Sequence, residues 1–396
     1  ATKSVMRKIK SIQYCLTPEI IVVLDGASPP VKADTVNDRK QTRADAAKKR
    51  DEVVRILPRK RKNNDAQEQT ATIEDHTAAS NQRKISAAKK AGATNRIIYA
   101  AVVSSVLSEL REKRIAYLVS PYEADGQLAY LNQRELIDYI ISEDSDFIPH
   151  RANAVLYKYT TDLPFGDDSD EAFKNCRGFA TLIRKQDLGA VTAPSFNLTG
   201  FTDTMIACTC VASGCDYATS LKGIGLVTAR EAVKDAFAMW SEDKESNPGG
   251  PIDYLLNRLF ERCKVTTAEK LKYTNNFVKA LVSFRHPVVF DPISSSCMYA
   301  NIQSPDADLM RFPGYASIIN SLDTNNNGHA LQDIVGELYP QELAEYIAQG
   351  YINPKTWELR EDDWDLPLSV IACLDQWNKR RSMLTPDERE IIIIND

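Results

Sequence analysis

Short apolar runs alternate with longer amphipathic stretches over the first 160 residues of the chain. Four runs are predicted to form buried strands: Ile20–Leu24, Ile115–Val119, Leu136–Ser142 and Ala154–Tyr157. Helical patterns precede the first three of them, at Val5–Leu16, Asn95–Arg114 and Tyr122–Gln133. Strands that alternate with helices predict an α/β fold on a doubly wound, mostly parallel sheet. Such a sheet carries its functional site at the carboxyl ends of its strands.

The pattern changes three times along the chain. Between Lys32 and Asn95 it is charged and Ala-rich, which predicts exposed helices inserted into the α/β part. Helical patterns dominate from Phe201 to Phe284, and the composition after Asn301 is acidic and loop-rich. We therefore expect an α/β core over 1–200 with an insertion at about 32–95, a helical region over 201–299 and an acidic C-terminal extension over 300–396.

Composition excludes several classes of protein. With 43% hydrophobic residues, the chain of 396 residues can bury real cores and is not globally disordered. Its longest aliphatic runs, Ile20–Leu24 and Ile391–Ile394, are too short to span a bilayer, so no membrane partner is expected. The 8 cysteines contain no C-x-x-C pair, which argues against a zinc site.

The net charge of −5 hides two oppositely charged segments. From Lys32 to Lys62, twelve basic residues face five acidic ones, a net charge of +7. From Ala300 to Asp396 the net charge is −10. A basic stretch of this kind tracks a phosphate backbone, or forms a solvated helical face. The run Pro58–Lys62 is alternatively a nuclear-import patch, and both roles remain open.

Carboxylates follow the predicted strands closely. They are Asp25 after the first strand, Glu123 and Asp125 after the second, Asp144 and Asp146 after the third, and Asp216 further along. A single Asp at a strand end is more often a turn former or helix cap. Pairs repeated after several strands favour one shared site instead. Clustered carboxylates repel one another unless cations bind, and hard oxygen donors without His or Cys suit Mg²⁺ or Mn²⁺.

These motifs resemble the flap endonuclease/XPG group of structure-specific 5′ nucleases, and most closely its exonuclease 1 branch. The residues that carry the resemblance, in matching order, are Leu24-Asp25-Gly26, Pro121-Tyr122-Glu123-Ala124-Asp125 through Leu131, Ser142-Glu143-Asp144-Ser145-Asp146, Ser213-Gly214-Cys215-Asp216-Tyr217, Ser220 through Leu226, Val289-Phe290-Asp291-Pro292 and Ile347-Ala348-Gln349-Gly350. Several ordered motifs are far less probable by chance than one short pattern.

The resemblance implies a role for each matching residue. Asp25, Glu123 and Asp125 would hold one Mg²⁺ ion, and Asp144, Asp146 and Asp216 would help to hold a second, with Mn²⁺ as a substitute. Lys32 and Arg39 would be the catalytic basic residues at the base of a helical arch. Arg43 lies one helical turn beyond Arg39 and would contact DNA.

The resemblance also implies a helix-two-turn-helix around residues 213–226. Gly223 and Gly225 would let backbone amides approach the DNA backbone, next to a helix N-terminus. A K⁺ ion would be held by Ser213, Ser220 and the Ile224 carbonyl. Simple capping is the alternative role of the two serines.

The function expected from this resemblance is Mg²⁺-dependent 5′→3′ DNA hydrolysis at 5′ ends and single-strand/double-strand junctions in DNA repair, by a two-metal mechanism. A flap endonuclease is the near alternative. Family members begin with Met-Gly and a strand bearing another metal-binding Asp, whereas this chain begins at Ala1. We therefore expect an N-terminally incomplete chain, and a DNA-junction-binding module with impaired catalysis is the second alternative. A nuclear monomer is expected, with the C-terminal region available to repair proteins.

Overall fold

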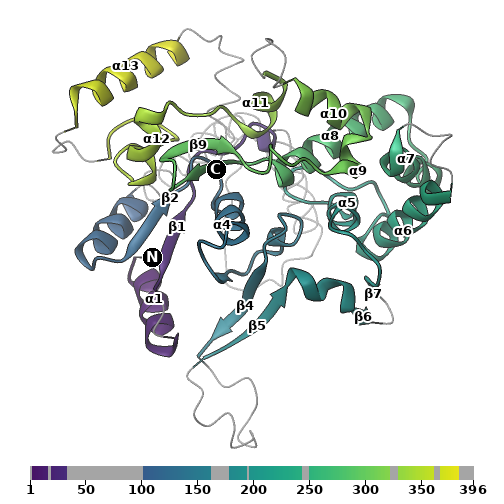
Figure 1. The fold of residues 1–396 in the computed structure, drawn as a ribbon, viewed down its shortest axis with the longest axis horizontal. Coiled ribbons are helices and arrows are strands. Elements are labelled where there is room, and N and C mark those ends of the chain that lie inside the picture. The colour runs from purple at the N-terminus through teal and green to yellow at the C-terminus, as the bar shows by residue number, and fades with distance from the viewer. Residues whose placement is uncertain are drawn as a thin grey trace, which may run out of the picture. The chain divides into compact units, whose positions relative to one another are not determined.

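The computed structural model describes residues 2–16, 19–33, 101–161, 178–193, 196–242, 249–321, 329–360 and 366–382 (Figure 1). These residues belong to two compact units. The first contains residues 2–10 and 101–114, and the second contains 11–33 and everything described from 115 onward. The predicted insertion at about 32–95 lies outside the described residues beyond Ala33.

The described residues of the first unit are mostly helical and bury apolar side chains. Helix α1 (Thr2–Leu16) begins in this unit and buries Met6 and Ile9, which stand three residues apart on one face. Residues 101–112 are helical and bury Leu107 and Leu110 with the same spacing. Helix α1 covers the predicted Val5–Leu16 and begins three residues earlier, and the helix at 101–112 lies within the predicted Asn95–Arg114.

The second unit contains parallel strand pairs. Strand β1 (Ile21–Leu24) pairs in parallel with β2 (Ala116–Val119), and β3 (Ile140–Ile141) pairs in parallel with β4 (Ala154–Thr160). Strand β5 (Phe179–Arg184) joins β4 antiparallel. The α/β class is thus confirmed, although β3 is shorter than its apolar run. The pattern did not predict β5, because its apolar residues are interrupted by Thr181 and do not alternate regularly with polar ones.

Helix α4 (Ala124–Gln133) follows β2 and connects the strands to the rest of the unit. The buried amide of Gln127 exchanges two hydrogen bonds with the backbone of Phe290, at 2.8 Å and 2.7 Å. Phe290 lies in β8 (Val288–Asp291), which forms an antiparallel pair with β9 (Ser296–Tyr299). A second short pair, β6 (Thr192–Ala193) and β7 (Phe196–Asn197), precedes the helical part.

The predicted helical region contains four helices that share one core. They are α5 (Asp203–Ser213), α6 (Leu226–Glu242), α7 (Gly250–Arg262) and α8 (Thr267–Arg285). Helix α8 begins with a capping box, in which Thr266 and Glu269 each bond the other's backbone N–H. Its apolar face, including the fully buried Phe277, packs into this core.

The region after Asn301 differs from the loop-rich extension that its composition predicts. It contains α9 (Ala307–Met310), α10 (Pro313–Asn320), α11 (His329–Val335), α12 (Gln341–Ala348) and α13 (Leu368–Ser382). Tyr315 of α10 and Leu331 of α11 are buried in the same core as α5–α8. The expectation was wrong because net acidity says nothing about the apolar face of short helices. Within the described part of the chain, no helix is both long and apolar enough to cross a bilayer.

Candidate active site

Lys32 lies between two of the predicted metal carboxylates. Its ammonium forms an ion pair with Glu123 and another, at 3.1 Å, with Asp216 Oδ2. The side chains of Lys32 and Glu123 are only 17% and 19% exposed. Burial lowers the pKa of Lys32, but the two carboxylates more than offset this effect and raise the pKa above its ordinary value. Three segments that are far apart in sequence therefore meet at one ammonium group.

Asp25 ends β1 and reaches the first turn of α4. Its Oδ1 accepts a 2.8 Å hydrogen bond from the backbone N–H of Ala124. Glu123 is the N-cap residue of α4, but its side chain makes no capping bond. Asp25 thus takes the place of the usual N-cap side chain. The Glu123 carboxylate is directed instead to Lys32 and to the hydroxyl of Tyr217, which donates a 2.7 Å hydrogen bond to Oε2.

Asp144 and Asp146 stand on a tight turn after β3. Asp144 Oδ1 accepts a 2.9 Å hydrogen bond from the Asp146 N–H and caps the short 3₁₀ helix Ser145–Phe147. Phe147 is completely buried and anchors this turn. Asp144 therefore has the helix-capping role that is usual for a single Asp at a strand end. The carboxylate of Asp146 interacts electrostatically with Asp144 and Asp216.

The acidic side chains interact electrostatically as one cluster. Burial, followed by repulsion from Asp144, Glu123 and Asp25, raises the pKa of Asp125 to about 7. Burial, followed by repulsion from Asp144 and Asp216, raises the pKa of Asp146 to about 7. Burial also raises the pKa of Glu123, against the opposing effect of Lys32. The six predicted carboxylates are thus linked through pairwise repulsion, with Asp25, Glu123 and Asp144 acting on Asp125, and Asp144, Asp216 and Glu123 acting on Asp146.

This donor set fits hard divalent cations by its chemistry. All the oxygen donors are carboxylates, and their burial and mutual repulsion would be relieved by a bound Mg²⁺ or Mn²⁺. Among the residues that the structure describes, no three acidic, His or Cys side chains stand ready-made in a metal-binding arrangement. The Lys32 ammonium is the counter-ion of Glu123 and Asp216 in this arrangement. The assignment of individual metal ligands remains a prediction.

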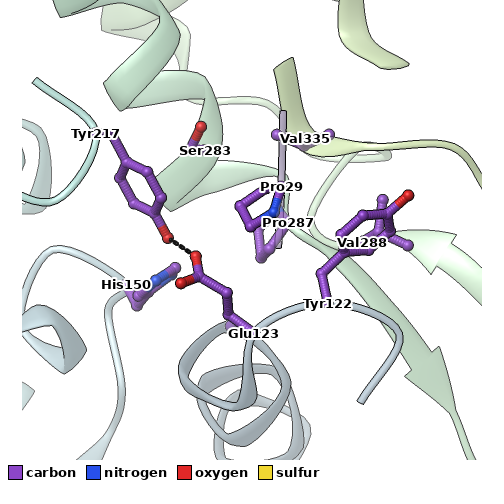
Figure 2. A pocket seen from close by; sticks show the side chains of 10 residues that line it. Pro29, Tyr122, Glu123, His150, Tyr217, Ser283, Pro287, Val288 and Val335 are labelled. Atoms are coloured by element: carbon purple, nitrogen blue, oxygen red, sulfur yellow. Dashed lines mark hydrogen bonds between the residues drawn. The ribbon is translucent and has the colours of Figure 1, made fainter. Parts of the chain in front are cut away.

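A small cavity lies behind Glu123 (Figure 2). It measures about 20 Å³, which is room for one water molecule, and Glu123, Tyr217, His150 and Ser283 are among its lining residues. The Nδ1 of His150 bonds the Phe284 carbonyl at 3.2 Å, while its buried Nε2 finds no partner in the described part of the structure. Burial lowers the pKa of His150 to about 3, so the ring is neutral at physiological pH.

The sequence motif contains Tyr217, but its residue pattern alone did not identify the tyrosine as part of the site. Its ring packs against Phe284 at 4.8 Å and lies 5.3 Å from the Lys32 ammonium. The position directly after Asp216 was the only available signal. Arg39 and Arg43, the other two predicted arch residues, lie outside the described residues.

The predicted helix-two-turn-helix corresponds to α5, the turn after it, and α6. Gly223 has φ +87°, and a Cβ added at Gly223 or Gly225 would meet no described atom within 4 Å. The turn before α6 is therefore open to a backbone phosphate. The Ser213 hydroxyl donates to the Cys210 carbonyl at 2.9 Å, which is an ordinary helix-end bond. The predicted K⁺ site of Ser213, Ser220 and Ile224 stays a prediction.

A protein family model matches the part of the chain that carries most of this site. The family model described as XPG I-region matches residues 114–216, the span that holds five of the six carboxylates. The resemblance to the flap endonuclease/XPG group is thereby confirmed. The chain is 27% identical to Exonuclease 1 of Arabidopsis thaliana, over 88% of this chain and 38% of that protein. It is 27% identical to Exodeoxyribonuclease 1 of Schizosaccharomyces pombe, over 85% of this chain and 45% of that protein.

Solved structures give weaker likenesses. The catalytic core of Rad2 in complex with DNA substrate matches with a TM-score of 0.42 and 17% identity, over 79% of this chain and 81% of that one. Human GEN1 in complex with Holliday junction DNA matches with a TM-score of 0.34 and 14% identity, over 77% and 68%. The chain spans less than half the length of the curated relatives named above.

Proposed function

We propose that this chain is the catalytic part of a Mg²⁺-dependent 5′→3′ DNA exonuclease that also cuts flaps at single-strand/double-strand junctions. The observation that carries the proposal is the convergence of Lys32, Glu123 and Asp216 from three separate segments, beside Asp125 and Asp146. A structural scaffold has no use for partly buried carboxylates that repel one another. The similarity to proteins named Exonuclease 1 over most of the chain supports the reaction class.

Different residues of the chain would have different roles in this reaction. Asp25, Glu123 and Asp125 would hold one ion, and Asp144, Asp146 and Asp216 the second. Bound ions would supply water activation and stabilise the departing 3′ oxygen of the phosphodiester. Once bound cations balance Glu123 and Asp216, the Lys32 ammonium would be available to pair with the scissile phosphate. The open turn before α6 would hold the duplex by its backbone, with little sequence readout.

The proposal is tested on DNA duplexes that carry a labelled 5′ end, a nick or a 5′ flap, with Mg²⁺ and Mn²⁺ titrated separately. Asp146→Asn should reduce cleavage by several orders of magnitude while junction binding, measured by fluorescence anisotropy, stays within about twofold of the wild type. The matched control is Asp187→Asn, since Asp187 is half exposed and pairs only with Arg184 among the residues described. Undiminished cleavage by Asp146→Asn would reject the metal assignment.

The same assay separates the alternatives. A preference for nicked duplex over gapped flaps supports an exonuclease, and the reverse preference supports a flap endonuclease. Tight junction binding without metal-dependent cleavage by the wild-type chain would identify a DNA-binding module. We further propose a nuclear location, in line with relatives named as exonucleases and as a DNA damage-inducible protein. A monomeric state and contacts of the C-terminal region with repair proteins belong to the same proposal.

A further inference from the structure

A short segment that begins in the last turn of α11 and leads towards α12 contacts both chain segments that carry the Lys32–Glu123 ion pair. We define this segment, Ile334–Tyr339, as the clasp. The Ile334 carbonyl accepts a 3.0 Å hydrogen bond from the N–H of Val31, the residue before Lys32. The Tyr339 hydroxyl donates a 3.0 Å hydrogen bond to the carbonyl of Pro121, two residues before Glu123.

The clasp also encloses the side chain of Tyr122, which directly precedes Glu123. The Tyr122 hydroxyl donates to the Glu337 carbonyl at 3.3 Å, and its ring lies 5.4 Å from that of Tyr339. Gly336 has φ +102°, and a Cβ there would lie 2.1 Å from Cζ of Tyr122. Only glycine lets the clasp pass this close to the ring.

Two tryptophans pack against the Tyr339 ring of the clasp. Tyr339 is 5% exposed, and its ring meets Trp357 edge-on at 4.8 Å and Trp377 of α13 at 6.1 Å. The tryptophan rings lie 5.1 Å from each other. Such aromatic groups bury large areas and hold fixed mutual geometry. The hydroxyl of Tyr339 therefore reaches Pro121 from a buried ring that is packed against two other aromatic side chains.

The loop before Glu123 is bonded from its other side as well. The carbonyls of Pro121 and Tyr122 accept hydrogen bonds from Ala27 at 2.9 Å and Gly26 at 2.6 Å, just after β1. The loop is thus held between the end of β1, which carries Asp25, and the clasp. Removing either side leaves the backbone of this loop held by only one of these two sets of bonds.

We propose that the clasp is a positioning element for Lys32 and Glu123, and that Tyr339 is a positioning residue for the reaction. The expected effect of Tyr339 on metal binding rests on the proposed function, whereas its expected effect on the backbone of the loop does not. The acidic C-terminal region, on this view, contributes to the site through the backbone carbonyls of the clasp and one aromatic hydroxyl rather than through its charge.

The test compares Tyr339→Phe, which keeps the ring and removes the hydroxyl, with Gly336→Ala, which displaces Tyr122. Tyr346→Phe is the matched control, because Tyr346 of α12 borders the same aromatic cluster and contacts Tyr351 rather than the loop. Amide hydrogen exchange is measured on the metal-free full chain. Both clasp variants should exchange about fivefold faster in peptides covering 26–33 and 119–127, the effect expected from losing about one hydrogen bond.

Peptides of α8 should exchange at the wild-type rate in all three variants, and the control should match the wild type throughout. Unchanged exchange at 26–33 and 119–127 in both clasp variants, or an equal increase over the whole chain, would overturn the proposal. Mn²⁺ binding by electron paramagnetic resonance adds a second readout, in which Tyr339→Phe should bind roughly fivefold more weakly. Absence of Mn²⁺ binding by the wild-type chain would reject the proposed function, while the exchange data would still decide the role of the clasp.

Discussion

The hydroxyl of Tyr217 donates a 2.7 Å hydrogen bond to Oε2 of Glu123, the carboxylate that also pairs with Lys32. Tyr217 comes from the turn after α5 and Glu123 from the start of α4, so this bond joins the helical region to the α/β part of the second unit. Both side chains line the small cavity described above (Figure 2). The orientation of Glu123 is therefore decided by partners from two other segments rather than by its own helix.

Tyr217→Phe should weaken both folding and metal binding. Loss of the hydroxyl removes a hydrogen bond to a partly buried carboxylate, so the free energy of unfolding should fall by about 1–3 kcal/mol. The Mg²⁺ concentration for half-maximal cleavage should rise several-fold because Glu123 loses an orienting partner. Urea unfolding and cleavage titrations check the two effects.

Tyr273→Phe is the control, since its buried hydroxyl has no hydrogen-bond partner in the described structure and its loss should be neutral or stabilising. Equal behaviour of the two variants would contradict the role assigned to Tyr217.

Lys32→Met should separate metal binding from catalysis. Without Lys32, Glu123 and Asp216 lose a counter-ion, and the metal-free variant should be less stable by about 1–3 kcal/mol. Mg²⁺ should then raise its unfolding temperature more than that of the wild type, while cleavage falls sharply. Thermal unfolding with and without Mg²⁺ measures this difference. Lys113→Met serves as the comparison, because its ion pair with Glu109 is exposed and contributes little to stability. An equal rise in unfolding temperature with Mg²⁺ in the wild type and in Lys32→Met would refute the idea that Mg²⁺ replaces Lys32 as the counter-ion of Glu123 and Asp216.

Substitutions of Asp25 should distinguish its two roles. Asp25→Asn keeps an oxygen that accepts the hydrogen bond from Ala124, whereas Asp25→Ala removes the cap of α4. The alanine variant should therefore be about 1 kcal/mol less stable than the asparagine variant. Both should lose metal-dependent cleavage. Substantial cleavage by Asp25→Asn would exclude Asp25 as a metal ligand, and equal stability of the two variants would exclude the capping role.

Stability should fall as the pH drops from about 6.5 to about 4, in part because of His286. Its Nδ1 bonds the Ala300 carbonyl at 2.9 Å and its Nε2 bonds the Tyr315 hydroxyl at 2.7 Å, which suits the neutral ring. Burial lowers the pKa of His286 to about 4; Arg285 lowers it further and Asp306 opposes this. The unfolded chain, with an ordinary pKa near 6.5, therefore binds more protons in this window.

The stabilisation from a neutral His286 is complete above about pH 6.5 and is lost as the pH falls towards 4, by at most about 3 kcal/mol. Urea unfolding of the wild type and of His286→Gln across this range measures the contribution as a difference in slope. Parallel pH profiles for the two proteins would show that His286 does not carry it.

Sequence alone determined the features that depend on local pattern. The apolar runs of β1, β2 and β4 are short and at least partly buried, so periodicity identified them. Asp25 and Glu123 were found because they come soon after two of these runs. The acidic region after Asn301 was misjudged, since composition averages over a helix and does not show that Leu343 and Ile347, one turn apart, are both buried. Strand β5 was also not predicted, because its apolar residues do not alternate regularly with polar ones.

Tertiary structure alone decided which groups meet. Glu123 and Asp216 lie 91 and 184 positions after Lys32 along the chain, and no local pattern indicates that one ammonium contacts both carboxylates. The hydroxyl of Tyr339 reaches Pro121 across 218 positions for the same reason. The sequence thus determined which chemistry the chain carries, because side-chain type and spacing are local properties. The fold decided how each carboxylate is held, because hydrogen-bond partners and burial arise only when distant segments pack together.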